Sequence, residues 1–281
     1  MNNFGGDWTK IKIEILVEYA KAYLSIMKDR PFFKLLYFDG FAGSGFIIKG
    51  EKLDVDVTVG AARRIIEISE PRSFDRYYFV EMDTKNFSLL TENTKLAFPE
   101  KNIAVVQEDC NKKIIALANY LKKPENKNVR TLAYIDPCGM QVEWSSIEYL
   151  RGLPIDMWIL VPTGMGVNRL LTTDGEKLDK KWMDRLELFL GMKKESIEAV
   201  FYRKEKTHTL FGEETYIVKE VNAIKKSAEL YHSKLKEVFD FVSKPYELKN
   251  SSNSIMYHLF LTSNNKAAER IANDIVNKYN R

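Results

Sequence analysis

Short apolar runs recur along the first half of the chain, and four of them lead to a carboxylate. The runs cover residues 35–38, 76–80, 103–107 and 131–135, and the acids that follow are Asp39, Glu81, Asp109 and Asp136. Runs of this length between polar segments are typical of buried strands. If these strands are parallel, the four acids lie along one edge of a sheet, where ligands bind in open α/β folds.

Segments with helical spacing of apolar residues separate the runs, and a fifth strand is expected over 156–161. This alternation predicts a parallel sheet with helices on both faces. Residues 163–240 interrupt it and predict a helical insertion or lid, including a long helix over about 215–240. Two apolar runs, 245–248 and 255–261, flank a polar turn and predict an antiparallel hairpin at the sheet edge. We therefore expect one α/β domain over 1–281, with a mostly parallel seven-stranded sheet.

Composition narrows the functional classes. The chain has 281 residues, a net charge of +4, two cysteines and three histidines. It contains no apolar run long enough to cross a membrane. Two cysteines cannot form a disulfide framework, which favours the reducing cytoplasm. No Cys/His cluster has metal-ligand spacing, so we expect no metal site. The mildly basic balance permits a nucleic-acid partner without requiring one.

The first apolar run ends in a glycine-rich turn, Asp39–Gly45, that lacks the G-x-G-x-x-G pattern. A turn of this kind suits a nucleoside cofactor, and NAD, FAD and S-adenosylmethionine are all candidates. The acids around the turn oppose a pyrophosphate and favour the methionine ammonium group, so S-adenosylmethionine is the expected cofactor. Glu81 would bind the ribose, and Asp109 the adenine amino group. The predicted cofactor contacts are Asp39, Gly40, Phe41, Ala42, Gly43, Gly45, Glu81, Met82, Asp109, Cys110 and Asp136.

These motifs resemble the class I S-adenosylmethionine-dependent methyltransferases, and more closely the three-Cys-motif partner protein (TcmP) family. The resemblance covers nearly the whole chain and is weakest over about 172–240. The matching residues are Trp8 with Lys10, 39–45, 79–81, 107–111, 134–139, 142–144, Asn168 with Arg169, and 257–264. It implies a Rossmann-like methyltransferase fold and a partner protein that carries the three-cysteine motif, a radical-type enzyme. The family usually has Asp-Pro-Phe-Gly where this chain has Asp136-Pro137-Cys138-Gly139.

Asp136-Pro137 also resembles the first half of the Asp-Pro-Pro-Tyr motif of methyltransferases that act on exocyclic amines of DNA bases. We therefore expect Asp136 and Pro137 to be catalytic, with Cys138, Gly139 and Arg169 contacting the substrate. Arg169 could bind a substrate phosphate or pair with Asp136. Cys138 could instead be a thiolate nucleophile, as in cytosine C5 methyltransferases. The glutamate motif of that class is absent, so a small packed side chain is the preferred interpretation.

The sequence thus predicts a methyltransferase that acts on a nucleic-acid base or nucleotide. One alternative is a non-catalytic S-adenosylmethionine-binding partner of the three-cysteine-motif enzyme. Another is a small-molecule methyltransferase with 163–240 as its lid. Asp39 and Asp136 also have a purely structural interpretation as turn or helix caps.

Overall fold

The computed structural model describes residues 7–47, 58–168, 171, 179–209 and 212–280. Its centre is an eight-stranded sheet in the order β10-β12-β7-β6-β1-β4-β5, with β11 also pairing with β12. The strands are β1 (Lys34–Asp39), β4 (Arg76–Val80), β5 (Ile103–Val106), β6 (Val129–Ile135), β7 (Ile155–Val161), β10 (Phe241–Val242), β11 (Tyr246–Lys249) and β12 (Ile255–Ser263). The predicted seven strands are all present, and the short β10 is the additional one.

Strands β1, β4, β5, β6 and β7 run parallel to one another, and β12 runs antiparallel to β7. β1 lies between β6 and β4, with Asp39 in register with Tyr134 on one side and Phe79 on the other. The carboxyl ends of all five parallel strands therefore meet at one edge. β11 and β12 form the predicted antiparallel hairpin. This arrangement is the expected Rossmann-like methyltransferase fold.

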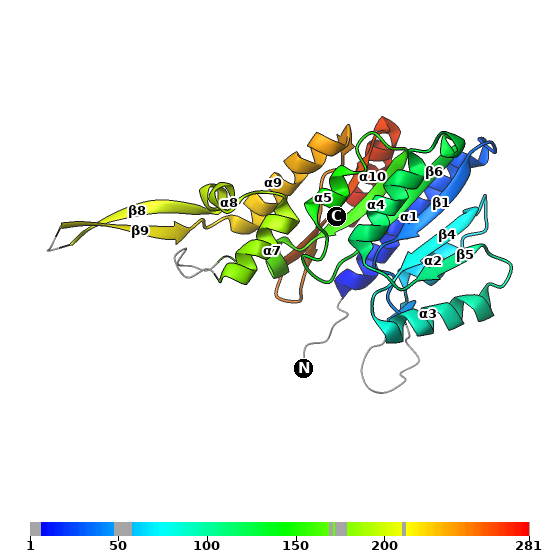
Figure 1. Ribbon diagram of the computed structural model, residues 1–281, viewed down its shortest axis with the longest axis horizontal. Helices are drawn as coiled ribbons and strands as arrows, with labels where there is room; N and C mark the ends of the chain where they lie inside the picture. Colours follow the sequence, from blue (N-terminus) through cyan, green and yellow to red (C-terminus); the bar gives the residue numbers. More distant parts are fainter. Residues whose placement is uncertain (1–6, 48–57, 169–170, 172–178, 210–211, 281) are drawn as a thin grey trace.

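Helices cover both faces of the sheet (Figure 1). Successive side chains of β1 point to opposite faces, so Leu35 and Tyr37 join one buried cluster while Leu36 and Phe38 join the other. The first cluster includes residues of α1 (Asp7–Lys28), α2 (Ala61–Ile66), α3 (Thr84–Ala97) and α10 (Lys266–Tyr279). The second includes residues of α4 (Cys110–Leu121), α5 (Trp144–Glu148), α7 (Lys180–Leu190), α8 (Lys194–Phe201) and α9 (Ala223–Val238).

Short elements complete the fold. A 3₁₀ turn, η1 (Pro124–Asn126), follows α4, and a π-helical turn, η2 (Thr163–Val167), follows β7. β2 (Phe46–Ile47) pairs with β3 (Thr58–Val59) beyond the glycine turn. No helix among the described residues has the length and apolar character needed to cross a membrane.

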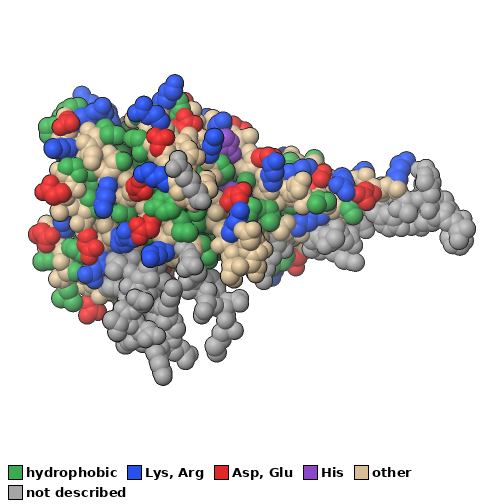
Figure 2. Space-filling view, turned by 180° about the vertical axis from the view of Figure 1, so that it is seen from behind, with side chains coloured by type: hydrophobic (Ala, Val, Ile, Leu, Met, Phe, Trp, Pro, Cys, Tyr) green, Lys and Arg blue, Asp and Glu red, His purple; other side chains and the backbone are tan. Residues whose placement is uncertain are grey.

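A two-stranded arm extends far from the body (Figure 1). It consists of β8 (Tyr202–Thr209) and β9 (Gly212–Lys219), which within the described chain pair only with each other. The prediction of a helix beginning near residue 215 was wrong, because α9 begins at Ala223. The run Thr215–Val218 is rich in β-branched and aromatic residues, which favour a strand. Figure 2 shows basic and acidic side chains interspersed along the arm.

Candidate functional site

The glycine turn at the end of β1 is bound to the ends of both neighbouring strands. Gly40 N–H donates to the Tyr134 carbonyl of β6 (2.9 Å), and Ala42 N–H donates to the Val80 carbonyl of β4 (3.0 Å). Gly43 has a φ of +62°, where a side chain would be strained. These contacts fix the turn above the point where β1, β4 and β6 end.

Gly40 is required by packing rather than by its backbone angle. A Cβ at this position would lie 2.5 Å from the Cys110 sulfur and 2.9 Å from Cδ1 of Ile135. Cys110 is the first residue of α4 and is 4% exposed. Burial, with the charges of Asp109 and Asp39, raises the pKa of its thiol. The side chain of Cys110 therefore supports the turn from below as a neutral, packed group.

Asp39 is a buried carboxyl at the last position of β1. It is 1% exposed, and its Oδ1 accepts the Phe41 N–H (3.1 Å) while Oδ2 accepts the Tyr37 hydroxyl (3.4 Å). Burial is the main cause that raises its pKa from 3.8 to about 7, and the charges of Asp136 and Glu81 add to the effect. Asp39 thus caps the turn, as its structural interpretation proposed, and lies close to two further carboxylates.

Glu81, just after β4, holds the other side of the turn. Its Oε2 accepts the Gly43 N–H (2.8 Å), and its Oε1 accepts the Asp83 N–H (2.8 Å). Each carboxylate oxygen has a second acceptor position, so the side chain retains capacity for two ligand hydroxyls. Met82 follows with a side chain that is 71% exposed. Glu81 thus has free acceptor positions beside an exposed apolar side chain, and its contact with a ribose stays a prediction.

Asp109 caps α4. Its Oδ1 accepts the Lys112 N–H (3.1 Å), the usual role of an aspartate at this position. The sequence identified Asp109 as a cofactor ligand because it follows a strand, and the same position also begins a helix. One carboxylate oxygen remains for a ligand, so contact with the adenine stays a prediction.

Asp136 forms a partly buried ion pair that the sequence pattern did not predict. Both of its oxygens accept from Lys12 Nζ, at 2.7 and 2.6 Å, and Oδ2 also accepts the Tyr134 hydroxyl (3.1 Å). Lys12 lies on α1 and is 8% exposed. Its spacing was the available signal, because Lys12 falls four residues after Trp8 and four before Leu16 on the buried face of the helix. Lysine is almost never fully buried unless it is paired.

An aromatic pair lies beside this ion pair. Lys12 Nζ is 5.1 Å from the centroid of the Trp8 ring, and Trp8 stacks on Tyr257 of β12 with centroids 5.3 Å apart. The Tyr257 hydroxyl donates to the Cys138 carbonyl (3.3 Å). These contacts connect α1 and β12 to the loop after β6.

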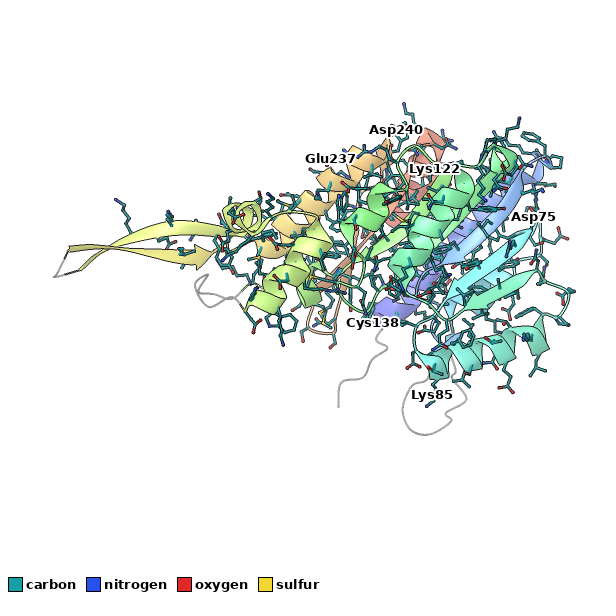
Figure 3. All side chains as sticks on the ribbon, in the orientation of Figure 1. Asp75, Lys85, Lys122, Cys138, Glu237 and Asp240 are labelled. Carbon is teal, nitrogen blue, oxygen red and sulfur yellow. The ribbon has the colours of Figure 1, made fainter. Side chains whose placement is uncertain are left out.

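The rest of that loop is more open. Pro137 is buried, whereas the Cys138 side chain is exposed (Figure 3). Partial burial and the negative charge of Asp136 raise the pKa of the Cys138 thiol, which disfavours a thiolate nucleophile. Gly139 has room for a side chain, with Gln141 Oε1 as the nearest atom at 3.6 Å. Arg169 lies outside the described residues, so its predicted contacts stay predictions.

The geometry therefore brings Asp39, Glu81 and Asp136 together around the glycine turn and adds Lys12 to the group. Among the described residues, no group of three or more His, Cys, Asp or Glu side chains is placed to hold a metal ion.

Comparisons with known proteins found distant structural likenesses only. No family model and no curated protein matches the chain. A Legionella pneumophila protein with the family-model designation DUF519 is 17% identical, with 94% of this chain and 99% of that chain covered and a TM-score of 0.45. DszA carbon methyltransferase is 11% identical, with 87% and 52% covered and a TM-score of 0.42. Trm1 of Pyrococcus horikoshii, in complex with S-adenosyl-L-methionine, is 10% identical, with 91% and 64% covered and a TM-score of 0.38. Likenesses this distant assign neither a cofactor nor a substrate to the chain.

Proposed function

We propose that this chain binds S-adenosylmethionine at the edge formed by β1, β4 and β5 and transfers its methyl group to a nucleic-acid base. One observation carries the cofactor assignment. Two N–H groups of the glycine turn, those of Phe41 and Gly43, already donate to the carboxylates of Asp39 and Glu81. A dinucleotide site offers such groups to a pyrophosphate. Here the carboxylates would repel a pyrophosphate and attract a cationic amino acid.

The residues at this edge have the chemistry that this cofactor requires. Glu81 would accept from the ribose hydroxyls, and Asp109 from the adenine amino group. Asp39 would supply negative potential for the ammonium group, since Lys12 offsets the charge of the nearby Asp136. When bound, the cofactor supplies an electrophilic methyl group on a sulfonium. The protein contributes binding and alignment.

Asp136 is the proposed acceptor-side residue. Lys12 and Tyr134 hold its carboxylate in one orientation, which suits a group that positions an amine or hydroxyl. We therefore assign Asp136 an orienting role, with Pro137 stiffening the loop and Cys138 and Gly139 facing the acceptor.

A polymeric acceptor is favoured over a small molecule by the arm. Lys219, at its base, donates from Nζ to the carbonyls of Asn168 (2.6 Å) and Leu171 (2.9 Å), which follow β7. The base of the arm therefore lies at the same sheet edge as the site. An isolated two-stranded hairpin is marginally stable. The outer part of the arm pairs only within itself in the described chain, so an extended partner is its simplest use.

The second candidate is the partner-dependent protein that the TcmP resemblance implies. The arm supports this candidate as much as it supports a nucleic-acid acceptor, because the outer edge of each strand could pair with a strand of another protein. In this version the cofactor site is retained and transfer requires the three-cysteine-motif partner, or does not occur.

Calorimetry with S-adenosylhomocysteine tests the cofactor assignment. Glu81→Ala should weaken binding by about 1–3 kcal/mol, the range for lost charge-assisted hydrogen bonds. Glu92→Ala on the exposed side of α3 is the matched control and should bind like the wild type. Equal affinity in Glu81→Ala would remove the ribose assignment, and tighter binding of NADH than of S-adenosylmethionine would reject the cofactor.

A labelled-methyl assay on cellular nucleic acid, with and without the partner, tests the reaction. Asp136→Ala should retain cofactor affinity within a few-fold and lose about a hundredfold or more in transfer rate. Transfer that does not depend on Asp136 would reject its role. Cofactor binding without any transfer would favour the second candidate.

A further inference from the structure

A groove on the α4 side of the sheet opens at the amino ends of β1 and β4, and its floor reaches Phe38, the residue before Asp39. It has a volume of about 380 Å³ and lies between α4 and the starts of β1 and β4. Lys34 and Arg76 are the first residues of these strands, whereas the candidate site lies at their last residues. At about 3.3 Å per residue, the two ends of β1 are roughly 17 Å apart. Figure 3 shows the same separation, with Asp75 and Cys138 at opposite ends of the sheet.

The floor of the groove is aromatic and apolar. Phe38 and Tyr78 are in register on β1 and β4, and their rings stack with centroids 5.9 Å apart and planes 7° apart. Phe38 is buried, and Tyr78 is partly exposed. Leu36, Leu117 and Tyr120 complete this lining. Such a surface suits a planar apolar group.

The rim of the groove carries cations without carboxylate partners. Within the described chain, none of Lys34, Arg76 and Lys113 forms an ion pair, and Arg76 lies 6.0 Å from the centroid of the Tyr78 ring. The one carboxylate in the lining, Asp75, accepts from Leu35 N–H (2.6 Å) and pairs with Arg72 (3.1 Å). The groove therefore has an excess of positive charge around an aromatic floor.

We infer that this groove is a binding site for a small organic anion with a planar apolar body, such as an aryl or nucleoside phosphate. The ring would lie against Tyr78, and the anionic group would reach Arg76 and Lys34. The volume is in the range of small-ligand pockets, about 300–1,000 Å³. The inference is independent of the proposed methyl transfer.

Fluorescence titration with 1-naphthyl phosphate tests the site, because this probe has the ring and the anion but no adenosine that could enter the cofactor site. A dissociation constant of about 0.5 mM is expected for a ligand of this size. Neutral 1-naphthol and inorganic phosphate should each bind at least about tenfold more weakly, because each lacks one half of the recognised chemistry. Equal affinity for either one would overturn the inference.

Two variants locate the binding. The pair Lys34→Glu with Arg76→Glu should weaken binding about tenfold or more through lost charge-assisted contacts. Ala116→Trp, on the exposed side of α4 within the groove, should block it by filling the space. Lys95→Glu, an exposed lysine on α3, is the control and should bind like the wild type. Unchanged affinity in both groove variants, or amide shifts centred on Gly43 and Glu81 in NMR spectra, would overturn the site.

Discussion

At the scale of single residues, Asp39 combines burial with a titratable group near neutral pH. Its pKa is raised to about 7, whereas an aspartate in the unfolded chain titrates near 3.8. The folded state therefore binds more protons than the unfolded state between these two values. By linkage, the free energy of unfolding falls as pH rises through this window and is level above it. An ionised, buried Asp39 thus lowers stability at neutral pH, which a cationic ligand would offset.

The variant Asp39→Asn should remove this pH dependence. Its gain in unfolding free energy over the wild type should be about 2–3 kcal/mol larger at pH 8 than at pH 5. Urea denaturation at the two pH values measures the difference. Binding of S-adenosylhomocysteine at pH 7 should also release part of a proton from the wild type and none from the variant. An identical pH profile and unchanged affinity would show that Asp39 only caps the turn.

Lys12 is expected to be a positioning residue for Asp136. The Lys12 side chain is 10% exposed, and the side chain of its partner Asp136 is 17% exposed. Removing one partner of such a buried pair leaves an uncompensated charge, so Lys12→Met should cost about 3–5 kcal/mol of stability. Lys10→Met, on the exposed face of the same helix, is the control and should change stability by less than about 0.5 kcal/mol.

A double-mutant cycle of Lys12→Met with Asp136→Asn separates the interaction energy of the pair from the contacts that each residue makes with its other neighbours. A coupling energy of about 1–3 kcal/mol is expected, since the two groups are in direct contact. Lys12→Arg should retain part of both stability and methyl transfer, because it keeps the charge. Additive effects of the two single substitutions would show that the ion pair does not position Asp136.

At the scale of elements, the glycine turn packs against the start of α4, where Gly40 lies next to Cys110. Gly40→Ala would place a Cβ 2.5 Å from the Cys110 sulfur, so a loss of about 1–3 kcal/mol is expected from overpacking. Cys110→Ala in the same chain should recover part of this loss, as thermal unfolding would measure. Gly139→Ala meets only the end of Gln141 at 3.6 Å and should be tolerated. Equal effects of both glycine substitutions would contradict the packing argument.

The elements that the sequence predicted well are those with strong local signals. Each parallel strand is a short apolar run. Because Asp39, Glu81 and Asp136 lie at the ends of such runs, the sequence correctly predicted that they meet at one edge of the sheet. The fold and the neighbourhood of the three acids followed from that pattern. The helical cap at Asp109 was foreseeable from the same residues, since an aspartate before a helical segment serves both roles.

Features that depend on tertiary contacts were not predictable in the same way. The Lys12–Asp136 pair joins residues 124 positions apart, and nothing near Asp136 in the sequence indicates it. The arm was missed for a different reason. Its strands carry many charged residues, and within the described chain they form ladder pairs only with each other, so they lack the alternation of a half-buried strand.

At the scale of the whole molecule, the sheet edge and the arm have separate roles in the proposed function. The body holds the proposed cofactor site, whose geometry is fixed by strand ends. The arm extends away from the body. Lys219 at its base donates hydrogen bonds to the segment after β7, beside that edge. The predicted single domain with an insertion over 163–240 stays a prediction, and this division gives it a functional meaning.

Shortening the arm is the test of that division. Replacing residues 205–216 with an Asn-Gly turn keeps Lys204 and Ile217 in register and preserves Tyr202 and Ile217, which pack on the body. Because the removed parts of the strands pair only with each other among the described residues, the melting temperature should change by no more than about 2–4 °C, the shift that about 1 kcal/mol produces in a chain of this size. Affinity for S-adenosylhomocysteine should also be retained, whereas affinity for nucleic acid should fall about tenfold or more.

A milder variant keeps the arm and changes only its charge. Arg203, Lys204 and Lys206 are exposed on β8, and Arg203 pairs at the surface with Glu205. Changing all three to glutamine should reduce the slope of log affinity against log salt by about 2–3, since each neutralised phosphate contributes roughly one unit. Lys225→Gln, Lys234→Gln and Lys236→Gln on α9 form a matched set away from the arm. Nucleic-acid binding that survives arm removal with an unchanged salt slope would assign the arm to a protein partner instead, because a strand edge recognises a backbone and not a phosphate.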